Sequence, residues 1–185
     1  MALPQDINTI DIYSRAALLA IFALWGASFI IGGIDWQSIG GSFLHHAILP
    51  FHEFGHVLFS PFGRFMAILG GSLFQVLMPL GLMLAFSMQR HDNFAAAIML
   101  WWCGQSFIDL SPYIADAPHR AIPLIRGVGE AAHDWGNLLT MTDNLGSAQG
   151  IAQTTFFIGS ILMTSAIVWG GYLLWQQYKQ LNLNN

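Results

Sequence analysis

A short segment of the chain has side chains that could bind a metal ion and transfer a proton. The run His52-Glu53-Phe54-Gly55-His56 places two histidines four residues apart, which puts both rings on one face of a helix. Two imidazoles at this spacing can hold one metal ion, and a neighbouring carboxylate can take a proton from a water bound to that ion. Zinc suits this chemistry because it lowers the pKa of its water towards ~7. The pattern predicts a Zn2+ site with Glu53 as the catalytic base.

The segments around this cluster are long and apolar. Of the 185 residues, 55% are hydrophobic and only 9% are charged, whereas a soluble domain has roughly 25% charged residues. Residues 16–34, 65–88 and 151–175 contain no charged residue, and each is close to the ~20 residues with which a helix crosses a bilayer. Residues 94–115 form a fourth such segment, interrupted only by Asp109. The sequence therefore predicts an all-α integral membrane protein.

The predicted organisation is a single membrane domain over residues 1–185. We expect a bundle of about five transmembrane or membrane-embedded helices, with a polar loop over residues 117–150 and the helices at about 16–34, 43–60, 65–88, 94–115 and 151–176. Helix 43–60 either spans the bilayer or is re-entrant. If it spans, most of the six basic residues fall on one side, so the positive-inside rule favours a cytoplasmic N-terminus. We expect the protein in a bacterial inner or cytoplasmic membrane.

The surroundings favour a functional role for the histidine segment. Ionisable side chains are costly inside a membrane and commonly mark a functional site there. The alternative is a pair of interfacial histidines with ordinary hydrogen bonds. Cys103 is the only cysteine, so neither an intrachain disulfide nor a cysteine-based zinc cluster can form. The net charge of -4 indicates no basic patch, so we expect no nucleic-acid partner.

These residues resemble the site-2 protease-like intramembrane zinc metalloproteases, in a small variant without a soluble substrate-selecting domain. The family has the form H-E-x-G-H, followed in the next helix by G-P-x-x-N. This chain has Gly71-Ser72-Leu73-Phe74-Gln75 there, with Ser72 in place of the proline and Gln75 in place of the asparagine. The resemblance implies that Gln75 holds the substrate backbone or the oxyanion. The alternative is a helix-packing patch in which Gln75 bonds to a neighbouring helix.

The third ligand is a choice among several residues. The family takes it from an N-x-x-P…D-G segment, which Asp109, Pro112 and Asp116 match loosely, with a spacing one residue shorter. The resemblance implies that Asp116 completes the site with His52 and His56. Asp109 is a rival, because Asp116 would lie ~33 Å along a straight helix unless the chain unwinds at the proline.

Two further histidine positions stay open. His133-Asp134 in the polar loop can ligate, or support a ligand from behind. It can equally mark a helix start, with Asp134 at the positive end of the helix dipole. His45 lies seven residues before His52 and falls on the same helix face. It either supports the site or faces water near the helix end, and we favour the second interpretation.

The leading prediction is a membrane-embedded zinc metalloprotease that hydrolyses peptide bonds of membrane or membrane-proximal substrates. The alternative is a non-catalytic subunit or scaffold of a larger membrane complex, because the chain is small and its second and third motifs are altered. A metal or proton transporter fits less well, since the polar residues form one cluster and paired broken helices are not evident.

Overall fold

The computed structural model describes residues 8–123 and 132–183, and every regular element in these ranges is a helix. The all-α class is therefore confirmed for this part of the chain. The α-helices are α1 (Thr9–Gly32), α2 (Trp36–Gly40), α3 (Phe43–Phe59), α4 (Arg64–Met88), α5 (Asn93–Ala115), α6 (Asp134–Met141) and α7 (Ala148–Leu183). Two 3-10 turns, Ser60–Phe62 and Leu145–Ser147, precede α4 and α7.

Three helical segments within the described residues are long and apolar enough to cross a membrane. They are Thr9–Gly32, Arg64–Met88 and Leu145–Leu183. Much of their surface is exposed and apolar, for example Leu24 on α1 and Val168 on α7, as expected of helix faces that contact lipid. The larger count of about five spanning or embedded helices stays a prediction, because it also needs α3 and α5.

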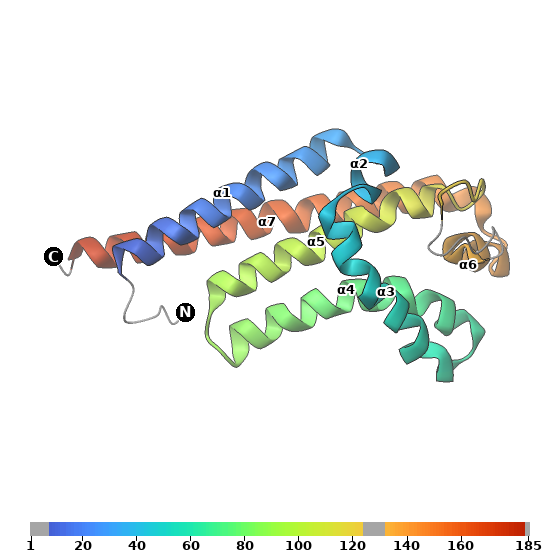
Figure 1. Ribbon diagram of the computed structural model, residues 1–185, viewed down its shortest axis with the longest axis horizontal. Helices are drawn as coiled ribbons and strands as arrows, with labels where there is room; N and C mark the ends of the chain where they lie inside the picture. The colour runs from blue at the N-terminus through green and yellow to red at the C-terminus, as the bar shows by residue number, and fades with distance from the viewer. Residues whose placement is uncertain (1–7, 124–131, 184–185) are drawn as a thin grey trace.

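Helix α5 is the most enclosed element. It runs beside α7 and α4, and α1 packs against both α7 and α5 (Figure 1). Trp101 and Ile108 pack against Phe29 of α1 and Met163 of α7. Because protein rather than lipid surrounds α5, its polar side chains can find partners inside the bundle, and Asp109 is among those that are buried.

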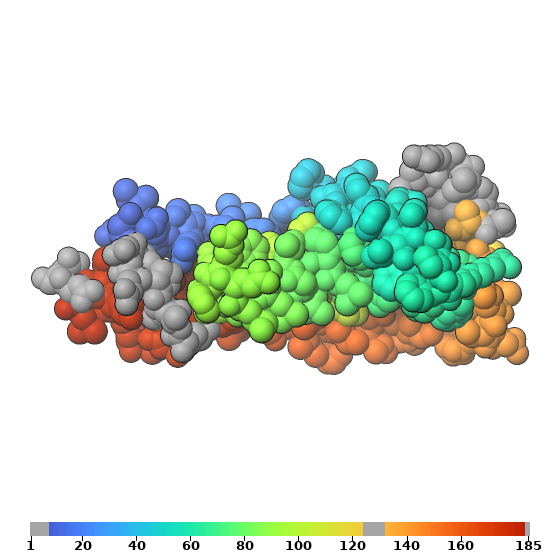
Figure 2. Space-filling model, turned by 90° about the horizontal axis from the view of Figure 1, so that it is seen from below, coloured from blue at the N-terminus to red at the C-terminus, as the bar shows by residue number. Residues whose placement is uncertain are grey.

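Helix α3, which carries the histidine segment, runs across the direction of the long helices (Figure 1). It begins at a Ser42 cap, whose hydroxyl accepts from the His45 N–H. It lies against α4, and the two helices cover adjoining parts of one face (Figure 2). Gly55 and Gly70 meet at the crossing, where a Cβ on Gly70 would lie 2.5 Å from the Gly55 carbonyl oxygen. Glycine at both positions therefore permits a close backbone approach.

Several element bounds differ from the predicted ones. Helix α1 begins at Thr9 rather than near 16, because Asn8 and Asp11 form a capping box. The short helix α2 was not predicted. The predicted polar loop 117–150 contains α6, and α7 begins within it at Ala148. His133 caps α6, with its Nδ1 accepting from the Gly136 N–H.

Candidate metal centre

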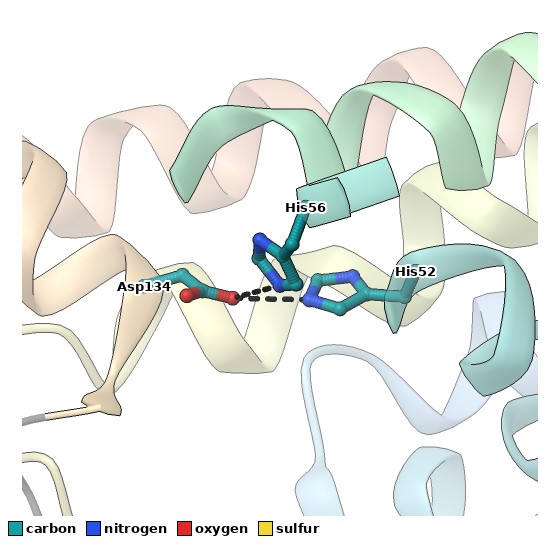
Figure 3. A group of neighbouring side chains, drawn as sticks. All are labelled: His52, His56 and Asp134. Carbon is teal, nitrogen blue, oxygen red and sulfur yellow. Dashed lines mark hydrogen bonds and ion pairs between the residues drawn. The ribbon is translucent and has the colours of Figure 1, made fainter. Parts of the chain in front are cut away.

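Two histidines of α3 and one aspartate of α6 converge on a single point. His52 Nε2 lies 3.0 Å and His56 Nε2 lies 3.3 Å from Oδ2 of Asp134. One ligand atom from each residue falls within 4.8 Å of the others. Figure 3 shows the carboxylate extending from the start of α6 towards the two rings. Within residues 8–123 and 132–183, these three residues are the group of His, Cys, Asp and Glu side chains that could hold a metal ion.

The hydrogen-bond partner of Nδ1 determines which nitrogen of the neutral His56 ring carries the proton. Nδ1 lies 2.8 Å from the backbone carbonyl oxygen of Ala67. A carbonyl oxygen only accepts, so Nδ1 must donate its N–H. In the neutral ring Nε2 then carries the lone pair and faces Asp134.

Nδ1 of His52 is also hydrogen-bonded, but to a side chain instead of a backbone carbonyl. Its Nδ1 lies 2.9 Å from Oε1 of Gln75. The amide is oriented by its other end, because Nε2 of Gln75 donates to Asp109 Oδ2 at 2.9 Å and to the Ser106 carbonyl at 3.3 Å. Gln75 Oε1 therefore accepts from His52 Nδ1–H, and in the neutral ring Nε2 of His52 carries the lone pair.

This arrangement fits a zinc ion. Two imidazole lone pairs and a carboxylate oxygen that point at one another repel, unless a cation or added protons lie between them. Two histidines and a carboxylate are also a donor set of zinc hydrolases. The hydrogen bond on the far nitrogen of each ring is the support that metal-ligating histidines usually have. Without a metal ion, protons on the two Nε2 atoms take its place: burial acts to raise the pKa of Asp134, but hydrogen bonds from protonated His52 and His56 prevail and hold that pKa below its ordinary value.

Gly71 makes room for the two rings. A Cβ at this position would lie 2.6 Å from Nε2 of His56 and 2.7 Å from Nε2 of His52. Both distances are shorter than real Cβ atoms show. The glycine therefore lets the α4 backbone pass directly beside the converging nitrogens.

Asp134 is positioned by contacts that span the sequence. Its backbone N–H donates to the hydroxyl of Tyr113 on α5 at 2.8 Å. The neighbouring Trp135 donates its indole N–H to Oγ of Ser72 on α4 at 3.1 Å. Ser72, which stands where the family has proline, thus ties α6 to α4.

The structure brings Asp134, rather than Asp116, to the two histidines. Oδ2 of Asp116 accepts from the Ile122 N–H at 2.8 Å. It also lies 3.3 Å from His133 Nε2, poorly aligned for a hydrogen bond. The physical reason is that α5 stays helical through Pro112 to Ala115. No unwinding carries Asp116 back to the histidines, and the chain returns to them with α6 instead.

The other candidates have supporting contacts. His133 is fully buried at the start of α6, and burial lowers its pKa. Asp109 lies 3.0 Å from Nδ1 of His45, so His45 turns inward rather than to water. Gln75 is 2% exposed and its amide bonds to protein groups, which matches the packing alternative more closely than direct contact with substrate.

Glu53 lines a cavity beside the centre. The cavity has a volume of about 570 Å³, and His52, His56 and Asp134 lie in its wall. The exposed Glu53 side chain is on the same wall. Among the described residues that line the cavity, none is Lys or Arg, and the apolar ones include Trp36, Leu49, Val57 and Leu110. The cavity thus offers a carboxylate base and apolar surface beside the three converging groups.

Comparison with known proteins adds no further family evidence. No protein-family model matches the chain, and neither a curated protein nor a solved structure matches it. The assignment of the site therefore stands on its own residues and geometry.

Proposed function

We propose that this protein is a membrane-embedded zinc metallopeptidase whose metal ligands are His52, His56 and Asp134. The observation that carries the proposal is the convergence of two imidazole Nε2 atoms on one carboxylate oxygen, with the far nitrogen of each ring held by a hydrogen bond. The three candidate spanning helices and the motif resemblance to site-2 protease-like enzymes support it. When bound, Zn2+ would polarise a peptide carbonyl and acidify a water molecule.

The chain's own residues would perform the remaining tasks. Glu53, exposed on the cavity wall, would take a proton as base and return it to the leaving amine as acid. The apolar side of the cavity would hold an extended, uncharged stretch of peptide. The substrates we propose are peptide bonds of membrane or membrane-proximal proteins, reached from the lipid bilayer. We also propose that the protein lies in a bacterial inner membrane with its N-terminus on the cytoplasmic side.

One observation favours the alternative, a non-catalytic subunit or scaffold of a larger membrane complex. The amide of Gln75, expected to hold substrate, already has protein partners on both of its polar atoms. If Gln75 does not bind substrate, the zinc ion of the proposed site could stabilise the fold of a non-catalytic subunit.

The experiment compares the wild-type protein with Glu53→Gln and His56→Ala, each purified as the full chain in lipid nanodiscs. Bound zinc is measured by mass spectrometry and cleavage with a library of membrane-protein peptides. We expect Glu53→Gln to keep zinc and lose cleavage, and His56→Ala to lose both. Equal cleavage by wild type and Glu53→Gln would contradict the peptidase. Zinc without cleavage in the wild type would support the scaffold.

A further inference from the structure

A chain of hydrogen-bonding side chains leads away from His52 into the bundle. Nδ1 of His52 meets Gln75 at 2.9 Å, Gln75 meets Asp109 at 2.9 Å, and Asp109 meets His45 at 3.0 Å. Gln75 and Asp109 are 2% and 4% exposed. The residues come from α3, α4 and α5, so this series of hydrogen bonds joins all three helices around the candidate centre.

Asp109 determines which way the amide of Gln75 points. An amide can present either its oxygen or its nitrogen to His52, and the two orientations differ little in shape. The carboxylate of Asp109 and the carbonyl of Ser106 only accept, so they select the orientation with Nε2 towards α5. The oxygen then faces His52 and keeps the proton on its Nδ1. Reversal would place an N–H donor against that N–H.

The two histidines differ in how they are held. His56 donates to a backbone carbonyl, that of Ala67, which no side-chain substitution removes. His52 donates to a side chain whose orientation depends on a second side chain. The tautomer of His52 is therefore open to change from a residue that does not touch it.

We propose that Asp109 is a positioning residue for the metal centre, which acts through Gln75 to keep Nε2 of His52 available as a ligand. This inference rests on the proposed zinc site. His45 completes the unit, because a buried carboxylate needs its acceptors satisfied and Nδ1 of His45 supplies a second donor to Asp109. The site thus extends beyond Gln75, which touches His52, to Asp109 and His45.

A double-mutant cycle tests this route. Zinc affinity of the full chain is measured by competition with a chromophoric chelator for wild type, Gln75→Met, Asp109→Leu and the double variant. Loss of such support typically weakens metal binding about 10–100-fold, and we expect that range for Gln75→Met. If Asp109 acts through Gln75, the double variant binds zinc no more weakly than Gln75→Met alone. If the fold-losses in zinc affinity of the two single variants multiply in the double variant, Asp109 does not act through Gln75 and the proposal is overturned.

A second readout separates positioning from general destabilisation. In zinc-loaded protein with 15N-labelled histidine, Asp109→Leu should speed solvent exchange of the His52 Nδ1–H. The His56 Nδ1–H, bonded to the Ala67 carbonyl, should be unchanged. Asp109→Asn, which keeps an acceptor oxygen for Gln75, should bind zinc more tightly than Asp109→Leu. Asp92→Asn is the control at the far end of α5, where either residue caps the helix.

The outcomes separate this inference from the function on which it rests. If wild type binds zinc, and Asp109→Leu binds it equally with an unchanged His52 signal, the positioning role is overturned and the metal centre stands. If wild type binds no zinc, the metal centre itself is overturned. If the His52 and His56 signals change together in Asp109→Leu, the effect is general loss of structure and the positioning role is overturned.

Discussion

The candidate centre has two halves that are built differently. In the α3–α4 half, His52 and His56 share a helix face and the neighbouring helix packs on them through glycine. In the α5–α6 half, Asp134 is placed by side-chain hydrogen bonds to Tyr113 and, through Trp135, to Ser72. The first half depends on backbone geometry, and the second depends on individual long-range contacts.

The two halves should differ in their sensitivity to mutation. A close backbone crossing has no slack, because neighbouring atoms cannot give way to an added methyl group. A single hydrogen bond to a hydroxyl contributes only about 1 kcal/mol, and water can take its place where the donor is partly exposed. Zinc binding should therefore be more sensitive to a small change in the α3–α4 half than to one in the α5–α6 half.

The largest effect should come from removing the proposed third ligand, Asp134. Asp134→Asn should lose most of the bound zinc, because an amide lacks the negative charge that balances the ion. Asp116→Asn is the matched control, because Asp116 contacts Ile122 and His133 and not the two histidines of the centre. We expect this variant to keep about one zinc ion per chain. Metal analysis of both purified variants gives the answer. Loss of zinc in Asp116→Asn with retention in Asp134→Asn would reverse our assignment and break the comparison.

The next effect concerns Gly71 in the α3–α4 half. Its substitution by alanine places a methyl group 2.6–2.7 Å from the two ligand nitrogens, and overpacking of this kind costs about 1–3 kcal/mol. We expect zinc affinity to fall by the corresponding factor of about 5–150. Gly81→Ala is the control on the same helix, because a Cβ there meets nothing within 4 Å. Equal affinities in the two variants would contradict the close approach of Gly71 to the two imidazole rings.

The same contrast explains what the sequence could predict. The pairing of His52 with His56 follows from helix periodicity over four residues, and the all-α class follows from the long apolar segments. The family pattern directed attention to Asp116, but Asp134 lies 82 residues from His52 along the chain. Its approach depends on packing of α6 against α4 and α5. Helical periodicity carries no information about such a contact.

Other features were missed for related physical reasons. The start of α1 at Thr9 had a readable signal, since Asn8 and Asp11 have the spacing of a capping box. His45 was expected to face water because helix register gives the face of a residue but not the neighbour opposite. The partner, Asp109, lies on α5, 64 residues away. Long-range polar pairs in this protein became visible only with the fold.

A smaller effect is expected for Tyr113→Phe in the α5–α6 half. The substitution removes the hydroxyl that accepts from the Asp134 N–H, at a cost of about 1 kcal/mol, so zinc should bind about fivefold more weakly. Tyr178→Phe on the exposed surface of α7 is the control. A loss larger than that caused by Gly71→Ala would show that the α5–α6 half is the more sensitive one.

The smallest effect should come from Ser72→Ala, which touches both halves. The serine lies on α4 one residue after Gly71, and it accepts the indole N–H of Trp135 on α6. Ser72 itself is buried, but Trp135 is partly exposed, so water can reach the indole from its own side, and we expect zinc affinity to fall by no more than about threefold. Ser165→Ala on the exposed face of α7 controls for loss of a hydroxyl. If Ser72→Ala and Tyr113→Phe combined weaken zinc more than the product of their separate effects, the two bonds hold α6 cooperatively. The α5–α6 half is then as tightly determined as the glycine crossing.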